Sequence, residues 1–240
     1  MEPAAINTLG FAHFLEHTDL VGKLVLGTLL LLSVASWYLI VTRAIANTLA
    51  QKRAAAFLAG FWEAPSLADA GKALATQAID NAFAELAQQA LQAASDSEVH
   101  SPHKLAAAGG LGEFLTRVLR NGIDQEAARA EHGLTVLASA GSAAPYVGLF
   151  GTVWGIYHAL VQIGLSGQGT LDKVAGPVGE ALIMTALGLA VAIPAVLAYN
   201  AFNRRNRMWL ARLDAFAHDL YVLTTVGPAK SGGARHTEAA

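Results

Sequence analysis

Cysteine is absent from the 240 residues of the chain. Structural disulfides and metal sites built on thiolates are therefore excluded. His158 lies in an apolar stretch and has no second ligand four residues further on, so we expect no metal site there. We also find no nucleophile paired with a base and no phosphate-binding loop. The sequence therefore predicts neither an enzyme nor a bound cofactor.

Charged residues are scarce, at 14% of the chain, while hydrophobic residues make up 54%. A soluble domain usually has about a quarter of its residues charged, so this composition indicates a membrane protein. The net charge of −2 gives no electrostatic footprint for nucleic acid. Residues 1–22 contain no Lys or Arg and thus lack the basic start of a secretory signal, so we expect the N-terminus to be retained.

Three stretches are apolar for long enough to cross a bilayer, which takes about 20 helical residues. They are residues 23–42, 133–166 and 177–203. The charge-free run that contains the second is too long for one span, so that helix must project beyond the membrane or break. Pro177 would stand at the start of the third helix, where proline is tolerated. The predicted fold is an all-α integral membrane protein with three transmembrane helices.

Lys and Arg are concentrated in two segments, 43–132 and 204–240, and positive charge marks the cytoplasmic side of a membrane protein. The N-terminal segment 1–22 and the hairpin 167–176 would then lie outside. Residues 43–132 are rich in alanine and read as a cytoplasmic helical domain. In its last part, Leu111, Phe114, Leu115, Val118 and Leu119 form one apolar stripe at helical spacing. The last segment is predicted to be a cytoplasmic helix and a tail.

Small residues recur at intervals of three or four in the second and third spans, which favours close helix packing. We assign to these packing faces Gly141, Gly148, Gly151, Gly155 and Gly188, together with Pro145 and Pro194. Such strips can pack helices within one subunit. Two long strips in a small protein also favour assembly around an axis, and ring symmetry is a common outcome.

Thr152 and Thr185 are threonines in the interior of the second and third spans, each flanked by apolar residues. Counted from the cytoplasmic ends of two antiparallel helices, they lie at nearly the same depth. Each hydroxyl could simply bond to a carbonyl of its own helix. A ring of hydroxyls at one level would instead hold water in a pore.

Glu180 stands near the outer end of the third span. An ionisable group inside a span suggests a function, although a carboxylate in the first helical turn also suits the helix dipole. No Asp, Lys or Arg lies deep in a span, so a membrane carboxylate would have to come from a partner. The basic cluster Arg204, Arg205 and Arg207 is an orientation signal that could also bind anionic lipids.

The stretch "PYVGLFGTVWGIYHAL" at 145–160, followed by "GEALIMTALGLAVAIPAVLAYN" at 179–200, resembles the paired signature of the ExbB/TolQ/MotA proton-channel family. Three spans with a large first cytoplasmic loop are similar to the ExbB and TolQ branches, whereas MotA has four spans. The segment "LDAFAHDLYVLTT" at 213–225 favours the ExbB branch.

This resemblance implies a homopentamer in the bacterial inner membrane whose second and third spans line a central channel. A dimer of the single-span partner ExbD would sit in the pore and supply the missing aspartate. Proton flow would drive TonB, which powers the uptake of siderophores and vitamin B12 through outer-membrane receptors. By motif position, Thr152 and Thr185 match the pore threonines of the family, and Glu180 matches its third-span glutamate.

Three other functions are considered at this point. One is a TolQ-type subunit, which pairs with TolR and TolA to energise envelope constriction. The second is a membrane scaffold that stabilises its partners without conducting protons. The third, a substrate transporter, would normally show deep charges or broken paired helices, and the sequence has neither.

Overall fold

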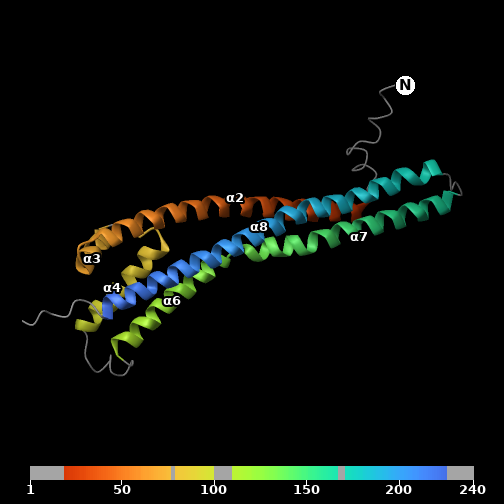
Figure 1. Ribbon diagram of the computed structural model, residues 1–240. Helices are drawn as coiled ribbons and strands as arrows, with labels where there is room; N and C mark the ends of the chain where they lie inside the picture. Colours follow the sequence, from red (N-terminus) through yellow and green to blue (C-terminus); the bar gives the residue numbers. More distant parts are fainter. Residues whose placement is uncertain (1–18, 77–78, 100–109, 167–170, 226–240) are drawn as a thin grey trace, which may run out of the picture. The chain divides into compact units, whose positions relative to one another are not determined.

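The structure of the chain is a computed structural model. It describes residues 19–76, 79–99, 110–166 and 171–225, and within these ranges the chain is helical with short connecting turns (Figure 1). The helices are α2 (Leu20–Glu63), α3 (Leu67–Thr76), α4 (Ala82–Val99), α6 (Leu111–Glu131), α7 (Leu134–Ser166) and α8 (Leu171–Thr225). The described ranges contain no strand, which confirms the predicted all-α class.

Three segments are long and apolar enough to cross a membrane: Leu20–Glu63, Leu111–Leu165 and Gly176–Thr225. The expectation of three membrane-spanning helices is confirmed by this finding. The helical part of each segment extends well past the length that a bilayer requires, which is about 20 residues. The predicted edges of the spans stay predictions.

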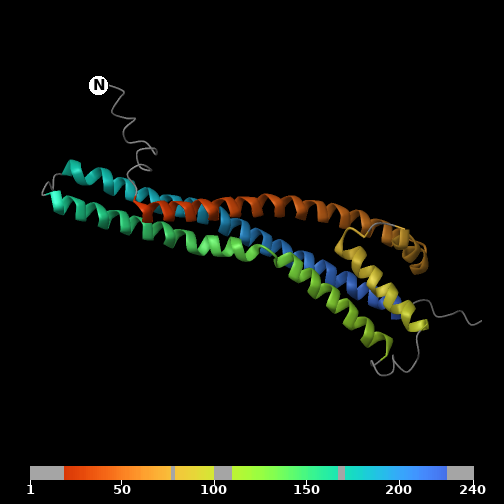
Figure 2. The same cartoon turned by 180° about the vertical axis from the view of Figure 1, so that it is seen from behind.

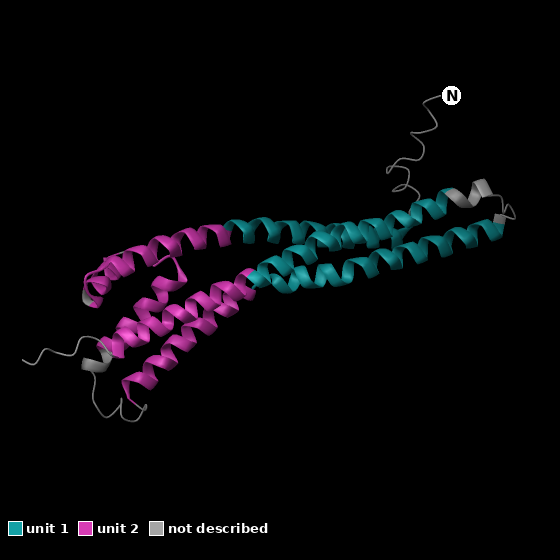
Figure 3. Cartoon of the chain, in the orientation of Figure 1, with its two compact units in different colours: residues 1–45, 132–204 teal, residues 46–131, 205–240 magenta. Residues whose placement is uncertain are grey.

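The chain forms two compact units (Figure 3). Unit 1 comprises residues 1–45 and 132–204, and unit 2 comprises residues 46–131 and 205–240. Two of the helices, α2 and α8, contribute residues to both units.

Unit 1 contains the first part of α2, all of α7 and the first part of α8, which lie side by side in both views (Figures 1 and 2). Its core consists of two groups of apolar side chains. The first is centred on Leu29, Ala144 and Met184, and the second on Leu137 and Ala195. Many large apolar side chains on the outer faces of these helices are exposed, as expected of helices that face lipid.

Unit 2 has a core rich in aromatic rings. Phe216 of α8 makes edge-on contacts with Phe61 and Phe83, whose ring centroids lie 5.3 and 5.4 Å away. Leu115 and Leu119 of α6 are buried in the same core. The apolar stripe predicted from residue 111 onward is therefore confirmed at these two positions.

Side-chain caps define where the shorter helices of unit 2 begin. The Ser66 hydroxyl accepts a hydrogen bond from the Asp69 backbone N–H at 3.1 Å, and the Asn81 side chain accepts one from Ala84 N–H at 2.9 Å. Both are N-cap interactions that satisfy otherwise unpaired amides of a first turn. Pro65 follows the end of α2 at Glu63, and proline disfavours helical geometry in the residue before it.

The long charge-free run that contains the second span forms one continuous helix of 33 residues, α7, which exceeds the roughly 20 residues that a bilayer requires, as the first of the two stated outcomes demands. Within the described residues, the chain breaks only at the start of this run. Helix α6 ends at Glu131, α7 begins at Leu134, and Gly133 between them has φ +78°. That conformation is available to glycine at little energetic cost. The expectation for Pro177 was wrong, because α8 begins six residues earlier, at Leu171, and Pro177 lies inside the helix.

Candidate functional site

The two predicted threonines meet inside unit 1. Thr152 Oγ1 of α7 lies 2.5 Å from Thr185 Oγ1 of α8. It also lies 3.0 Å from the Ala181 carbonyl oxygen of α8 and 3.1 Å from the Gly148 carbonyl oxygen of its own helix. Thr152 is buried, with 6% of its surface exposed, while Thr185 is partly exposed. The prediction that the two hydroxyls lie at the same depth is confirmed.

The number of hydroxyl protons in this cluster limits which group donates in each hydrogen bond. A threonine hydroxyl has one proton to donate and two lone pairs that accept. The shortest contact is consistent with Thr185 donating to Thr152, which leaves the Thr152 proton for one of the two carbonyls. The Thr152 oxygen therefore lies within hydrogen-bond distance of its own helix at Gly148 and of α8 at Ala181 and Thr185, and its one proton is donated to one of the two carbonyls.

Glycines bring α7 and α8 close enough for this contact. A Cβ at Gly148 would lie 2.6 Å from the Met184 carbonyl oxygen, and a Cβ at Gly188 would lie 2.6 Å from the Ala144 carbonyl oxygen. A Cβ at Gly155 would lie 3.1 Å from the Ala181 side chain. Real Cβ atoms do not approach a backbone oxygen so closely, so the first two positions require glycine.

Two further glycines of α7 complete the packing. A Cβ at Gly141 would collide with the Val196 side chain of α8, and a Cβ at Gly151 would collide with Met184 and lie 2.8 Å from Val25 Cγ1 of α2. All five predicted packing glycines therefore pack within the chain. Of the two possibilities for these strips, packing within one subunit applies to all five glycines, because α7 and α8 fill the space beside each other's glycines and α2 also fills it at Gly151.

Pro145 and Pro194 both lie inside helices, in α7 and α8 respectively. A proline inside a helix cannot donate its backbone hydrogen bond and so leaves one carbonyl of the preceding turn without its usual partner. Both prolines are partly buried. Their contribution to packing around a channel stays a prediction.

Glu180 lies in α8, nine residues after the first residue of the helix, Leu171, and is partly buried. The alternative that it occupies the first turn of its helix is therefore wrong, because the helix begins earlier than the sequence suggested. Stabilisation by the helix dipole is confined to the first turn and does not account for a carboxylate at this position. Glu180 remains a candidate for a functional role.

A contact between Asp19 and Trp154 was not predicted from the sequence. Trp154 Nε1 of α7 donates a 2.6 Å hydrogen bond to Asp19 Oδ2, and the Gly22 backbone N–H donates to Asp19 Oδ1 at 2.8 Å. Burial raises the pKa of Asp19, but these two hydrogen bonds and the nearby charge of His158 outweigh burial and lower it. A tryptophan inside a span was the available signal, because a buried indole N–H normally has a partner.

The remaining predicted residues are exposed or partly exposed. Arg204 and Arg207 are exposed and Arg205 is partly exposed, all in α8. His158 is exposed on α7. Among the described residues, no group of three or more His, Asp or Glu side chains could hold a metal ion.

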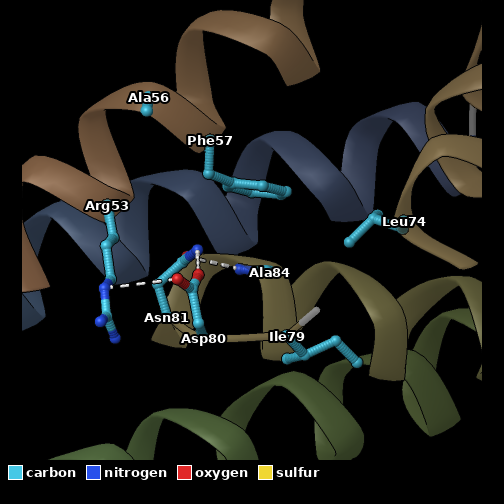
Figure 4. Close-up of a pocket in the computed structure, with 8 residues that line it drawn as sticks. All are labelled: Arg53, Ala56, Phe57, Leu74, Ile79, Asp80, Asn81 and Ala84. Carbon is cyan, nitrogen blue, oxygen red and sulfur yellow. Dashed lines mark hydrogen bonds and ion pairs between the residues drawn. The ribbon is translucent and has the colours of Figure 1, made fainter. Parts of the chain in front are cut away.

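Unit 2 has a cavity of about 340 Å³ (Figure 4). Arg53 of α2 and Asp80 line the cavity and form an ion pair at 3.3 Å, and Phe57, Leu74 and Ile79 provide apolar lining. Both charged side chains are about half exposed, so the pair stabilises the unit only slightly. The cavity lining contains no combination of side chains typical of a catalytic centre.

Comparison with known proteins shows which family the sequence matches. Residues 75–215 match the profile of the MotA/TolQ/ExbB proton channel family. The chain is 42% identical over 236 residues to the biopolymer transport protein ExbB of Xanthomonas campestris pv. campestris, covering 93% of this chain and 92% of that protein. It is 47% identical to ExbB of Neisseria meningitidis serogroup B, covering 85% and 90%. It is 35% identical to the Tol-Pal system protein TolQ of Pseudomonas aeruginosa, covering 93% and 96%.

Proposed function

The chain belongs to the MotA/TolQ/ExbB proton channel family, and from this premise we propose that it is the proton-channel subunit of an ExbB-type energy-transducing complex. In this proposal five copies form a ring in the bacterial inner membrane, with the N-terminus in the periplasm and the C-terminus in the cytoplasm. An ExbD dimer occupies the central pore, and TonB passes the work to outer-membrane receptors for siderophores and vitamin B12.

The observation that carries this proposal is the hydroxyl pair of Thr152 and Thr185. Both groups can accept a proton at oxygen while they donate their own, as a proton path requires. The sequences of the described α7 and of residues 181–203 in α8 contain no Asp, Glu, Lys or Arg. These two segments therefore supply no carboxylate beside the hydroxyl pair, in keeping with an acidic partner helix.

The energy available is adequate for mechanical work only if several protons are coupled. One elementary charge that crosses the membrane yields about 2.3 kcal/mol per 100 mV. The close packing of α7 on α8 provides a rigid wall for such a device, because Gly148 and Gly188 allow the two backbones to touch. We assign to Arg204, Arg205 and Arg207 the role of anchoring the wall at the anionic inner leaflet.

Removing the hydroxyls tests the proposal directly. We would measure proton entry into vesicles that contain the full chain with its membrane partners, for wild type and for Thr152→Val and Thr185→Val. We expect each variant to lower the proton flux by about tenfold or more. Thr28→Val is the matched control, because the Thr28 hydroxyl in α2 is exposed and bonds to the Leu24 carbonyl oxygen of its own helix. Wild-type flux in both pore variants would contradict the proposal.

Glu180 is tested separately because it lies in another turn of α8. Glu180→Gln keeps the size of the side chain and removes its charge, and Glu180→Ala removes both. If the carboxylate takes part in proton transfer, both variants lose flux to a similar extent. If Glu180→Gln conducts like wild type, the side chain serves only packing.

A TolQ-type role is the second candidate, supported by 35% identity to the Pseudomonas aeruginosa protein over most of both chains. The higher identity to the ExbB relatives favours the first candidate. Purification of the chain from its own membranes, with identification of the proteins that copurify, separates the two. A non-conducting scaffold is indicated if partners are stabilised while wild type shows no proton flux.

A further inference from the structure

The contact between Asp19 and Trp154 joins the residue just before α2 to the middle of α7, 135 positions later in the chain. Both residues belong to unit 1 and both are partly buried. Asp19 already accepts the Gly22 backbone N–H with its other oxygen, which is sufficient to cap the helix. The bond to Trp154 is therefore additional to capping and links two helices.

This link lies two residues from Thr152. One residue on the other side of Thr152, Gly151 packs directly on Val25 of α2. Thus α2 contacts α7 immediately before and after the threonine. From α8, the Ala181 carbonyl and the Thr185 hydroxyl contact the threonine itself. The segment of α7 that carries the hydroxyl is accordingly held on two sides.

We propose that Asp19 and Trp154 are positioning residues that hold α7 against α2, so that Thr152 stays in register with Thr185. The proposal rests on the proposed function only for its effect on proton flow. A hydrogen bond to an ionised carboxylate is stronger than one between neutral groups, and its direction fixes the orientation of the indole ring. The ring of Trp154 also stacks on Phe150, with centroids 6.4 Å apart, so its orientation is transmitted to the neighbouring turn of α7.

The first test does not depend on proton flow. Because the chain has no cysteine, Thr152→Cys provides a single thiol at a buried position. We would measure its reaction rate with a small water-soluble thiol reagent in the assembled complex, alone and combined with Asp19→Asn, with Trp154→Phe, and with both. Asn keeps the capping oxygen, and Phe keeps the apolar ring without the N–H.

We expect Asp19→Asn and Trp154→Phe each to raise the reaction rate by roughly three- to tenfold. The double substitution should add little, because both changes remove the same bond. Trp37→Phe is the matched control, since Trp37 is an exposed tryptophan of α2, and it should leave the rate unchanged. Unchanged rates in the Trp154→Phe chain, or additive effects in the double variant, would overturn the proposal.

If Thr152→Cys fails to accumulate, hydrogen–deuterium exchange of the amides around Thr152 reports the same positioning with the native threonine in place. The second test is proton flux in the same variants without the reporter. Faster exchange or labelling together with reduced flux supports the whole inference. Faster exchange or labelling in a chain whose wild type carries no protons leaves the positioning role intact and rejects the proposed function.

Discussion

Thr152 and Thr185 lie on two helices that run in opposite directions, yet their hydroxyl oxygens are 2.5 Å apart. Neither hydroxyl faces away from the bundle. Thr152 is buried between α7 and α8, while Thr185 retains part of its surface. The pair therefore combines a buried threonine with one that keeps part of its surface accessible to a neighbouring group.

The pair should respond differently to substitutions that keep or remove the hydroxyl. Thr152→Ser retains the hydrogen bonds, so we expect thermal unfolding of the purified chain near that of wild type. Thr152→Val leaves the Thr185 hydroxyl and the Ala181 carbonyl oxygen without this partner and should lower the free energy of unfolding by about 1 kcal/mol. In a chain that already carries Thr152→Val, the further substitution Thr185→Val should lower the free energy of unfolding by less than Thr185→Val does alone. Additive losses would contradict a direct bond between the two hydroxyls.

Counting residues was sufficient to place this pair at one depth, because helical rise is constant and the two spans are antiparallel. The partner of the glycine strips could not be predicted in the same way. A strip of small residues indicates that another helix packs closely against it, but which helix this is depends on three-dimensional packing. In the described chain Gly148 meets Gly188 and Met184 of α8, so the simpler of the two readings, packing within one subunit, applies to it.

Gly188 should tolerate no larger side chain. A Cβ there would lie 2.6 Å from the Ala144 carbonyl oxygen and 3.1 Å from the Gly148 Cα, and neither backbone atom can move without separating α7 from α8. We expect Gly188→Ala to destabilise the purified chain by about 3 kcal/mol in a denaturation experiment. Gly27→Ala is the matched control in α2, where no atom lies within 4 Å of the added Cβ. Equal stability of the two variants would argue against close packing at Gly188.

Two features of the site were not predicted from the sequence, and the first of them depends on a long-range contact. Asp19 and Trp154 are 135 residues apart, and no periodic pattern relates them. The position of Glu180 was misjudged for a local reason. Proline is favoured at the first helical position, so Pro177 suggested a helix start, but α8 continues through it from Leu171.

Gly133 should resist substitution for a conformational reason. Its φ of +78° lies in the left-handed region, which costs other residues about 1–2 kcal/mol. A Cβ would also lie 3.1 Å from Leu39 Cδ2, although that methyl group can shift. We therefore expect Gly133→Ala to lower the free energy of unfolding by about 1–2 kcal/mol. Gly60→Ala, in a helix with open space around the added carbon, should be neutral or stabilising. A neutral Gly133→Ala would mean that the chain between α6 and α7 adopts another conformation.

The pH dependence of the free energy of unfolding should reveal the lowered pKa of Asp19. Its pKa in the folded chain is lowered from 3.8, because the hydrogen bonds from Trp154 and Gly22 and the charge of His158 together outweigh the opposing effect of burial. The unfolded chain then binds a proton more readily than the folded chain, so stability rises with pH. The contribution is fully present above the unfolded value and is lost as the pH falls through the folded pKa. We would measure the free energy of unfolding of wild type and Asp19→Asn as a function of pH. The part of their difference that comes from the Asp19 carboxylate should be constant above about pH 5 and shrink in stronger acid.

The Trp154→Phe variant tests whether the hydrogen bond from the indole causes this pH dependence. Trp154→Phe removes the larger of the two hydrogen-bond effects on the carboxylate while the Gly22 cap remains, so the pKa of Asp19 should move upward toward 3.8. The acid loss of stability should then begin at higher pH in this variant than in wild type, whereas the Trp37→Phe control should follow the wild-type curve. A Trp154→Phe curve that coincides with wild type would mean that the indole does not stabilise the charged carboxylate. The link between α2 and α7 would then have to depend on apolar packing, such as that of Val25 on Gly151.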